Sequence, residues 1–157
     1  MKKLLLLIIL AAVTAQFVGG QSLENQNEKD KFIAAVQSLE DAPAGETAKE
    51  TREWALEYSQ QVKYPFCDEI SFLFFAPEIR GEVMSQYLMK LAAFELENPG
   101  RKSEANAAQA AGLESALKVY EKIVKAVPKA KNRKLDSLVE LRNKNQLMNF
   151  VKSANCK

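Results

Sequence analysis

The apolar residues of this chain recur every three or four positions, and this spacing constrains its fold more than any other feature. Such a period marks one face of an α-helix, whereas a half-buried strand alternates at every second residue. No segment alternates convincingly with a period of two. We therefore predict an all-α fold, a bundle or irregular array of about five helices.

The predicted helices are separated by turn and capping signals. Thr47 and Glu50 have the spacing of a capping box at the start of the second helix. Pro77 suits the first turn of the third helix, and Ser103 can cap the fourth, which Pro128 closes. The small residues 105–112 would let a neighbouring helix approach closely. The apolar patterns cover residues 32–39, 47–62, 77–97, 103–127 and 135–151.

The first residues have the form of a secretory signal. Lys2 and Lys3 precede an apolar run over residues 4–13, and Val13, Thr14 and Ala15 supply small residues for cleavage. The run is too short for a transmembrane helix, which needs ~20 residues, so no membrane span is expected after cleavage. We predict a signal peptide over 1–15, with cleavage at the latest after residue 20. A polar segment over 16–28 and a single helical domain over 29–157 follow, in the periplasm or the extracellular space.

Composition removes several classes of function. Histidine is absent, which takes away the commonest general base and the commonest metal ligand, so no metal or cofactor is predicted. The whole chain has 22 basic and 20 acidic residues, a net charge of +2. Near-neutrality gives no electrostatic basis for binding nucleic acid.

The near-neutral total conceals an asymmetry between the two halves of the chain. Residues 16–79 carry 12 acidic and 5 basic residues, while residues 80–157 carry 8 acidic and 15 basic residues. We expect the two halves to face each other as solvated, complementary surfaces. The alternative is a charged surface that steers a partner.

Two cysteines in an exported chain predict one disulfide. Cys156 lies 89 positions after Cys67, so a bridge would pin the C-terminus to the middle of the chain. A reactive thiol is the alternative, but the sequence has neither a C-x-x-C pair nor a histidine to lower the pKa of a thiol.

The segment 66–75 is the densest apolar stretch after the signal and contains four of the eight phenylalanines. One reading is a short helix or extended segment packed into the bundle and fixed by the bridge. The other is an exposed aromatic surface that takes an apolar ligand or a partner helix. The candidate residues of that surface are Phe66, Ile70, Phe72, Phe74 and Phe75.

Two patterns resemble catalytic motifs. Ser115 and Lys118 match S-x-x-K, in which a lysine one turn away helps to activate a serine, but the S-D-N and K-T-G partners do not occur. Glu53 and Glu57 flank aromatic residues as a glycosidase pair would, yet helical spacing on a solvated face explains them without chemistry. We therefore predict that the protein is not an enzyme.

A set of turn and packing residues carries one wider resemblance. Its elements are Cys67 after a Pro-aromatic step, Glu97-Asn98-Pro99, Gln109 with Gly112-Leu113-Glu114, Ala116-Leu117, Tyr120-Glu121, Pro128-Lys129-Ala130-Lys131, Leu135-Asp136 and Cys156. Over residues 29–156 the chain resembles a family of short exported bacterial helical proteins with no known activity. The resemblance implies a shared fold and export, and it adds no site residue.

Taken together, these features favour a non-catalytic interaction or structural protein of the bacterial periplasm or extracellular space, whose partner is another protein. The alternative is a carrier of an apolar small molecule bound between helices near residues 66–75. A cavity lined by the phenylalanines of that segment would favour the carrier.

Overall fold

In the computed structural model, residues 19–74, 80–100, 104–154 and 156 are described, and every regular element within these ranges is helical. The all-α prediction is confirmed, with seven α-helices in the described residues where about five were expected. Two short 3-10 turns, η1 (Phe72–Phe74) and η3 (Pro128–Ala130), accompany them. The α-helices are α1 (Gly19–Asp41), α2 (Glu46–Ser59), α3 (Asp68–Ser71), α4 (Gly81–Glu97), α5 (Ala105–Ala126), α6 (Arg133–Asn143) and α7 (Leu147–Ser153).

The single C-terminal helix predicted over 135–151 is wrong, because the chain breaks between α6 and α7. Asn145 adopts a left-handed conformation with φ of 57°, which asparagine tolerates better than most residues. Its N–H donates to the carbonyl of Arg142, and the N–H of Gln146 donates to the carbonyl of Leu141. These two bonds form a Schellman motif, which satisfies the last carbonyls of α6 and ends the helix.

Several predicted helix starts also differ from the structure. The capping box at Thr47 is wrong, since α2 begins at Glu46 and its N-cap is Gly45, which has no side chain. Pro77 and Ser103 lie outside the described residues, and α4 begins only at Gly81. The closure of the fourth helix at Pro128 is confirmed, because α5 ends at Ala126 and Pro128 opens η3.

The chain divides into two compact units, residues 1–31 and residues 32–157. The predicted signal peptide, residues 1–15, lies outside the described residues. The described part of the first unit is helical from Gly19, so α1 begins well before the apolar pattern at residue 32. Within this unit the side-chain amide of Gln26 donates to the carboxylate of Asp30 over 3.0 Å. No helix in the described part of the chain is long and apolar enough to cross a membrane.

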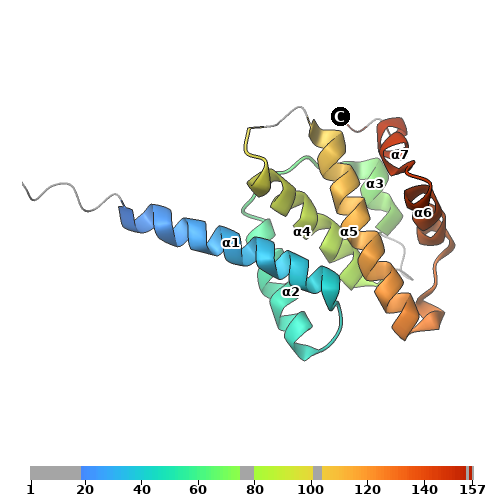
Figure 1. The fold of residues 1–157 in the computed structure, drawn as a ribbon, viewed down its shortest axis with the longest axis horizontal. Helices are drawn as coiled ribbons and strands as arrows, with labels where there is room; N and C mark the ends of the chain where they lie inside the picture. Colours follow the sequence, from blue (N-terminus) through green and yellow to red (C-terminus); the bar gives the residue numbers. More distant parts are fainter. Residues whose placement is uncertain (1–18, 75–79, 101–103, 155, 157) are drawn as a thin grey trace, which may run out of the picture. The chain divides into compact units, whose positions relative to one another are not determined.

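In the second unit α4 is buried on two faces. One face packs with the end of α1 and with α2 in a cluster of Phe32, Val36, Leu39, Ala55, Met89, Ala92 and Ala93. The other face, which includes Tyr87 and Leu91, joins a larger cluster built from α3, α5, α6 and α7. Figure 1 shows α4 and α5 side by side, with α6 and α7 beyond α5. A helix that is apolar around most of its circumference has to be covered in this way.

Gly112 allows the close contact between α4 and α5. A Cβ atom at this position would lie 2.9 Å from Cδ2 of Tyr87 and 3.2 Å from Cδ2 of Leu91. Only glycine leaves room for the tyrosine ring at this point. The prediction that the small residues 105–112 admit a neighbouring helix is confirmed here.

Candidate functional site

The aromatic segment 66–75 is divided between core and surface. Ile70 is fully buried and Phe74 is 3 % exposed, and the Phe74 ring stacks on Tyr87 with centroids 5.0 Å apart. These two residues are core, which corrects their assignment to a binding surface, because α3 and η1 turn them toward α4. Phe66 is 45 % exposed. The side chain of Phe72 and all of Phe75 lie outside what the structure describes.

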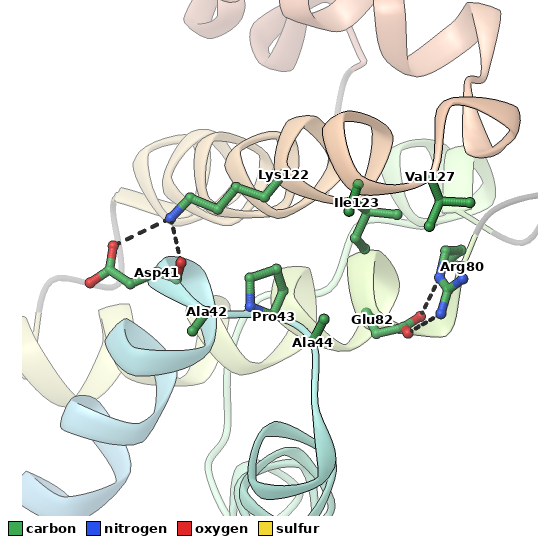
Figure 2. A pocket seen from close by; sticks show the side chains of 10 residues that line it. Asp41, Ala42, Pro43, Ala44, Arg80, Glu82, Lys122, Ile123 and Val127 are labelled. Atoms are coloured by element: carbon green, nitrogen blue, oxygen red, sulfur yellow. Dashed lines mark hydrogen bonds and ion pairs between the residues drawn. The ribbon is translucent and has the colours of Figure 1, made fainter.

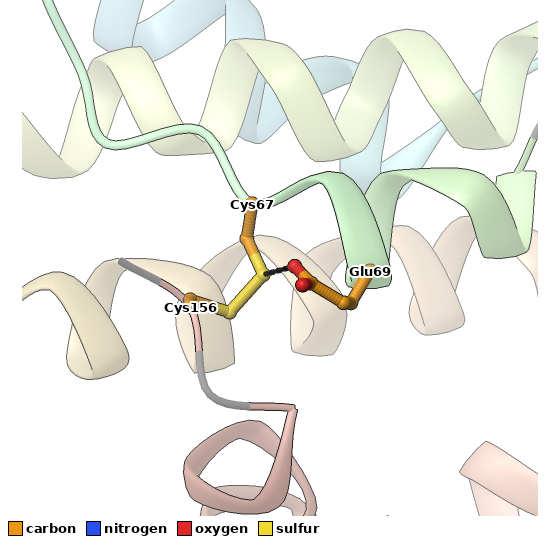
Figure 3. A group of neighbouring side chains, drawn as sticks. All are labelled: Cys67, Glu69 and Cys156. Atoms are coloured by element: carbon orange, nitrogen blue, oxygen red, sulfur yellow. Dashed lines mark hydrogen bonds between the residues drawn. A yellow bond between two sulfur atoms is a disulfide. The ribbon is translucent and has the colours of Figure 1, made fainter.

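The predicted disulfide joins Cys67 and Cys156, with Cα atoms 5.2 Å apart. The bridge ties the chain after α7 to the residue before α3 (Figure 3). Glu69 places Oε2 3.4 Å from Sγ of Cys67. A disulfide sulfur has no hydrogen to donate, so this is a contact and adds no hydrogen bond. Cys67, Glu69 and Cys156 would have the ligand types of a metal site, but a bridged sulfur is not a thiolate ligand.

Ser115 and Lys118 belong to a network of polar side chains that links α1, α4 and α5, and all of its members except Lys118 are buried. Ser115, on α5, is 1 % exposed and donates its hydroxyl to Oε2 of Glu40 at the end of α1 over 2.5 Å. Lys118 binds Oε1 of the same carboxylate over 2.8 Å. Gln86, on α4, donates its amide to Ser115 over 2.8 Å and to the carbonyl of Val36 over 3.0 Å. The serine is enclosed between helices, where a substrate could not reach its hydroxyl.

Glu40 is ionised at neutral pH in this arrangement. Burial opposes its charge, but the hydrogen bonds from Lys118 and Ser115 outweigh burial and hold the pKa of its carboxyl below the usual value. The bond to Glu40 in turn raises the pKa of Lys118. A protonated lysine cannot accept a proton from a serine. The geometry therefore supports a structural role for Ser115 and Lys118.

A cleft of about 400 Å³ lies where the loop after α1 meets the start of α4 and the end of α5. Lys122 donates to the carbonyl of Asp41 over 2.9 Å and approaches its carboxylate at 3.5 Å (Figure 2). Arg80 binds Glu82 through two nitrogens, and these bonds hold the pKa of the Glu82 carboxyl below its usual value. Each charged group that lines this cleft thus has an ionic partner, which leaves no free charge for a ligand.

A second cleft of about 440 Å³ adjoins the first and shares Asp41 and Lys122 with it. It is lined entirely by polar residues, among them Lys118, Glu121 and Lys125. None of the candidate residues of segment 66–75 lines either cleft. Neither of these two clefts therefore supports an apolar carrier near residues 66–75.

The end of α5, the turn that follows it and the start of α6 carry a dense group of positive charges, which we call the basic patch. Segment 125–134 contains five basic residues and no acidic one, and all five are exposed. Of these five basic residues, only Lys131 forms an ion pair with the described part of the chain, to Asp136 at 3.9 Å. The members of the basic patch are Lys125, Lys129, Lys131, Arg133 and Lys134.

Buried hydrogen bonds hold this turn in place. The hydroxyl of Tyr120 accepts from the backbone N–H of Asn132 over 2.7 Å and lies 2.8 Å from Oδ1 of Asp136, to which it donates. The side chain of Asn132 caps α6 by accepting from the N–H groups of Lys134 and Leu135. The basic patch is therefore presented on an anchored turn.

A second charged surface follows the outer face of α2. Four carboxylates occur at spacings of four, three and four residues, which places them in one line along the helix. All four are exposed, and within the described residues only one of them forms an ion pair, Glu46 with Lys49 at 4.0 Å. We call Glu46, Glu50, Glu53 and Glu57 the acidic stripe. The pair Glu53 and Glu57 thus lies on a solvated face, away from both clefts.

The expected pairing between the acidic and basic halves is formed only in part. Two described ion pairs join the halves, Lys118 with Glu40 and Lys122 with Asp41. The acidic stripe and the basic patch make no described ion pair with each other. Sequence reasoning noted the charged halves but missed the basic patch, although five bases without an acid in ten residues is a visible signal.

Comparisons of the chain with protein families, with curated proteins and with solved structures found no significant match.

Proposed function

We propose that this protein is a non-catalytic exported interaction protein of the bacterial periplasm or extracellular space, and that its basic patch contacts the partner. The observation that carries the proposal is the charge of the anchored turn. Arg133 and Lys134 occupy the first turn of α6, where the helix dipole disfavours positive charge. Repulsion among five exposed cations adds to this cost. Folding does not require such an arrangement, and recognition of an acidic surface would use it.

The disulfide and the N-terminal sequence support the proposal of export. Structural disulfides persist in oxidising compartments such as the periplasm. The apolar run over 4–13 after Lys2 and Lys3 would direct the chain there. Mass spectrometry of the periplasmic and secreted fractions should find an N-terminus at Gln16 or Gln21. A full-length chain confined to the cytosol would contradict export.

The interaction role is tested by photo-crosslinking in the producing cells. A photoreactive residue in place of Lys129 should give a discrete protein adduct, while the same residue in place of the exposed Lys144, outside the basic patch, should not. Absence of an adduct at 129, or equal adducts at both positions, would contradict a role for the basic patch in interaction.

A further inference from the structure

The acidic stripe and the basic patch are opposite in charge and equally accessible. Four exposed carboxylates form the stripe and five exposed cations form the patch. The stripe extends over about 16 Å, since its ends are eleven residues apart at ~1.5 Å each. The stripe lies on α2, which packs against α4, and the patch runs from the end of α5 to the start of α6.

We propose that copies of this chain associate with the acidic stripe of one copy on the basic patch of another. This proposal rests on the interaction role proposed above and names the partner as a second copy. A chain that carries both surfaces is complementary to itself. Lys118 and Lys122 lie outside the contact, because Glu40 and Asp41 already occupy them.

The net charge of the chain distinguishes a second copy from a polyanion. Without Lys2 and Lys3 of the predicted signal, the remaining 20 basic and 20 acidic residues cancel, so the mature protein has little long-range attraction for nucleic acid or an anionic membrane. Either of these would contact the basic patch alone, and the acidic stripe would repel it. Self-association uses both surfaces, so reversing either one has to abolish it.

The contact should be strongly dependent on salt. Exposed ion pairs are weak individually and are screened by ions. The screening length is about 30 Å at 0.01 M ionic strength and about 3 Å at 1 M. Analytical ultracentrifugation of the mature protein should therefore detect associated copies at the lower ionic strength and monomers at the higher one.

Charge reversal gives a sharper test. One variant carries Glu50→Lys, Glu53→Lys and Glu57→Lys, and the other carries Lys125→Glu, Lys129→Glu and Arg133→Glu. Each variant alone should be monomeric, because its two surfaces have the same sign. An equimolar mixture should associate again, since each variant then supplies the surface that the other lacks. Circular dichroism checks that both variants are folded.

A matched control reverses three exposed lysines elsewhere, with Lys63→Glu, Lys144→Glu and Lys152→Glu. It changes the net charge as much as the patch variant does and should associate like the wild type. A wild type that is monomeric at 0.01 M ionic strength would overturn the proposal. So would association that survives reversal of the stripe, or a mixture that stays monomeric.

The crosslinking experiment at position 129 separates this proposal from the broader one. An adduct with twice the mass of the mature chain supports self-association. An adduct with a different protein would leave the interaction role intact and overturn self-association. The absence of any adduct would contradict both.

Discussion

Ser115 donates its hydroxyl to the carboxylate of Glu40 over 2.5 Å, across 75 positions of sequence. This bond joins α5 to the end of α1 in the interior of the protein, since Ser115 is only 1 % exposed and Glu40 only 7 % exposed. Gln86 donates to the same serine from α4. One hydroxyl thereby holds three helices together.

Ser115→Ala should destabilise the protein by about 1–3 kcal/mol, because the buried carboxylate of Glu40 and the amide of Gln86 would each lose a partner. Urea unfolding followed by circular dichroism measures the change. Ser137 is exposed and bonds only to the carbonyl of Arg133 within its own helix, so Ser137→Ala should cost below ~0.5 kcal/mol. Equal effects of the two substitutions would show that the buried hydrogen bonds of Ser115 do not stabilise the fold.

The contribution of Glu40 to stability should depend on pH. Its folded pKa lies below the unfolded value of about 4.5, so the contribution is complete above that value and disappears as the pH falls through the folded pKa. Glu40→Gln should therefore reduce stability at pH 7 by more than at pH 3. Urea titrations of both proteins at each pH provide the measurement. A loss that is the same at both pH values would show that the charge of Glu40 is not involved.

Gly112→Ala should destabilise the contact between α4 and α5 by about 1–3 kcal/mol, since the new Cβ would press on the ring of Tyr87. Gly81 is the matched control, because a Cβ there meets nothing within 4 Å and its backbone is not in the left-handed region. Gly81→Ala should be neutral or slightly stabilising. Thermal unfolding of both variants tests the difference, and a tolerated alanine at position 112 would contradict the close packing.

Phe74→Ala should cost about 3–5 kcal/mol, as for other buried phenylalanines that leave a cavity. Phe66→Ala should cost only about 1 kcal/mol, because nearly half of the surface of Phe66 is already exposed. The melting temperatures of the two variants should therefore differ clearly. Similar melting temperatures would mean that Phe74 is not part of the core.

Removal of the disulfide should lower stability by up to about 4–5 kcal/mol on the chain-entropy model for a separation of 89 residues. Cys156→Ser should melt at a lower temperature than the wild type in non-reducing buffer, and reductant should have little further effect on it. Two free thiols in the native wild-type protein would exclude the bridge.

Local signals in the sequence determined the helical class and several boundaries. The apolar period and Pro128 after α5 are signals that extend over only a few residues. The two cysteines are far apart, but they leave only one possible pairing. The break at Asn145 was missed because asparagine only permits the left-handed conformation, whereas glycine or proline would have signalled it. The glycine cap of α2 was missed because Thr47 and Glu50 fit the capping-box pattern two residues after the true N-cap, Gly45.

The tertiary structure alone decided the role of the candidate residues. The spacing of Ser115 and Lys118 is the same whether the serine is open to solvent or buried, and only the approach of Glu40 from α1 shows that it is buried. The same holds for Ile70 and Phe74, because an apolar segment is equally compatible with core and surface until α4 covers it. Periodicity and charge are local properties of a chain, whereas burial and ion pairing depend on which helices meet.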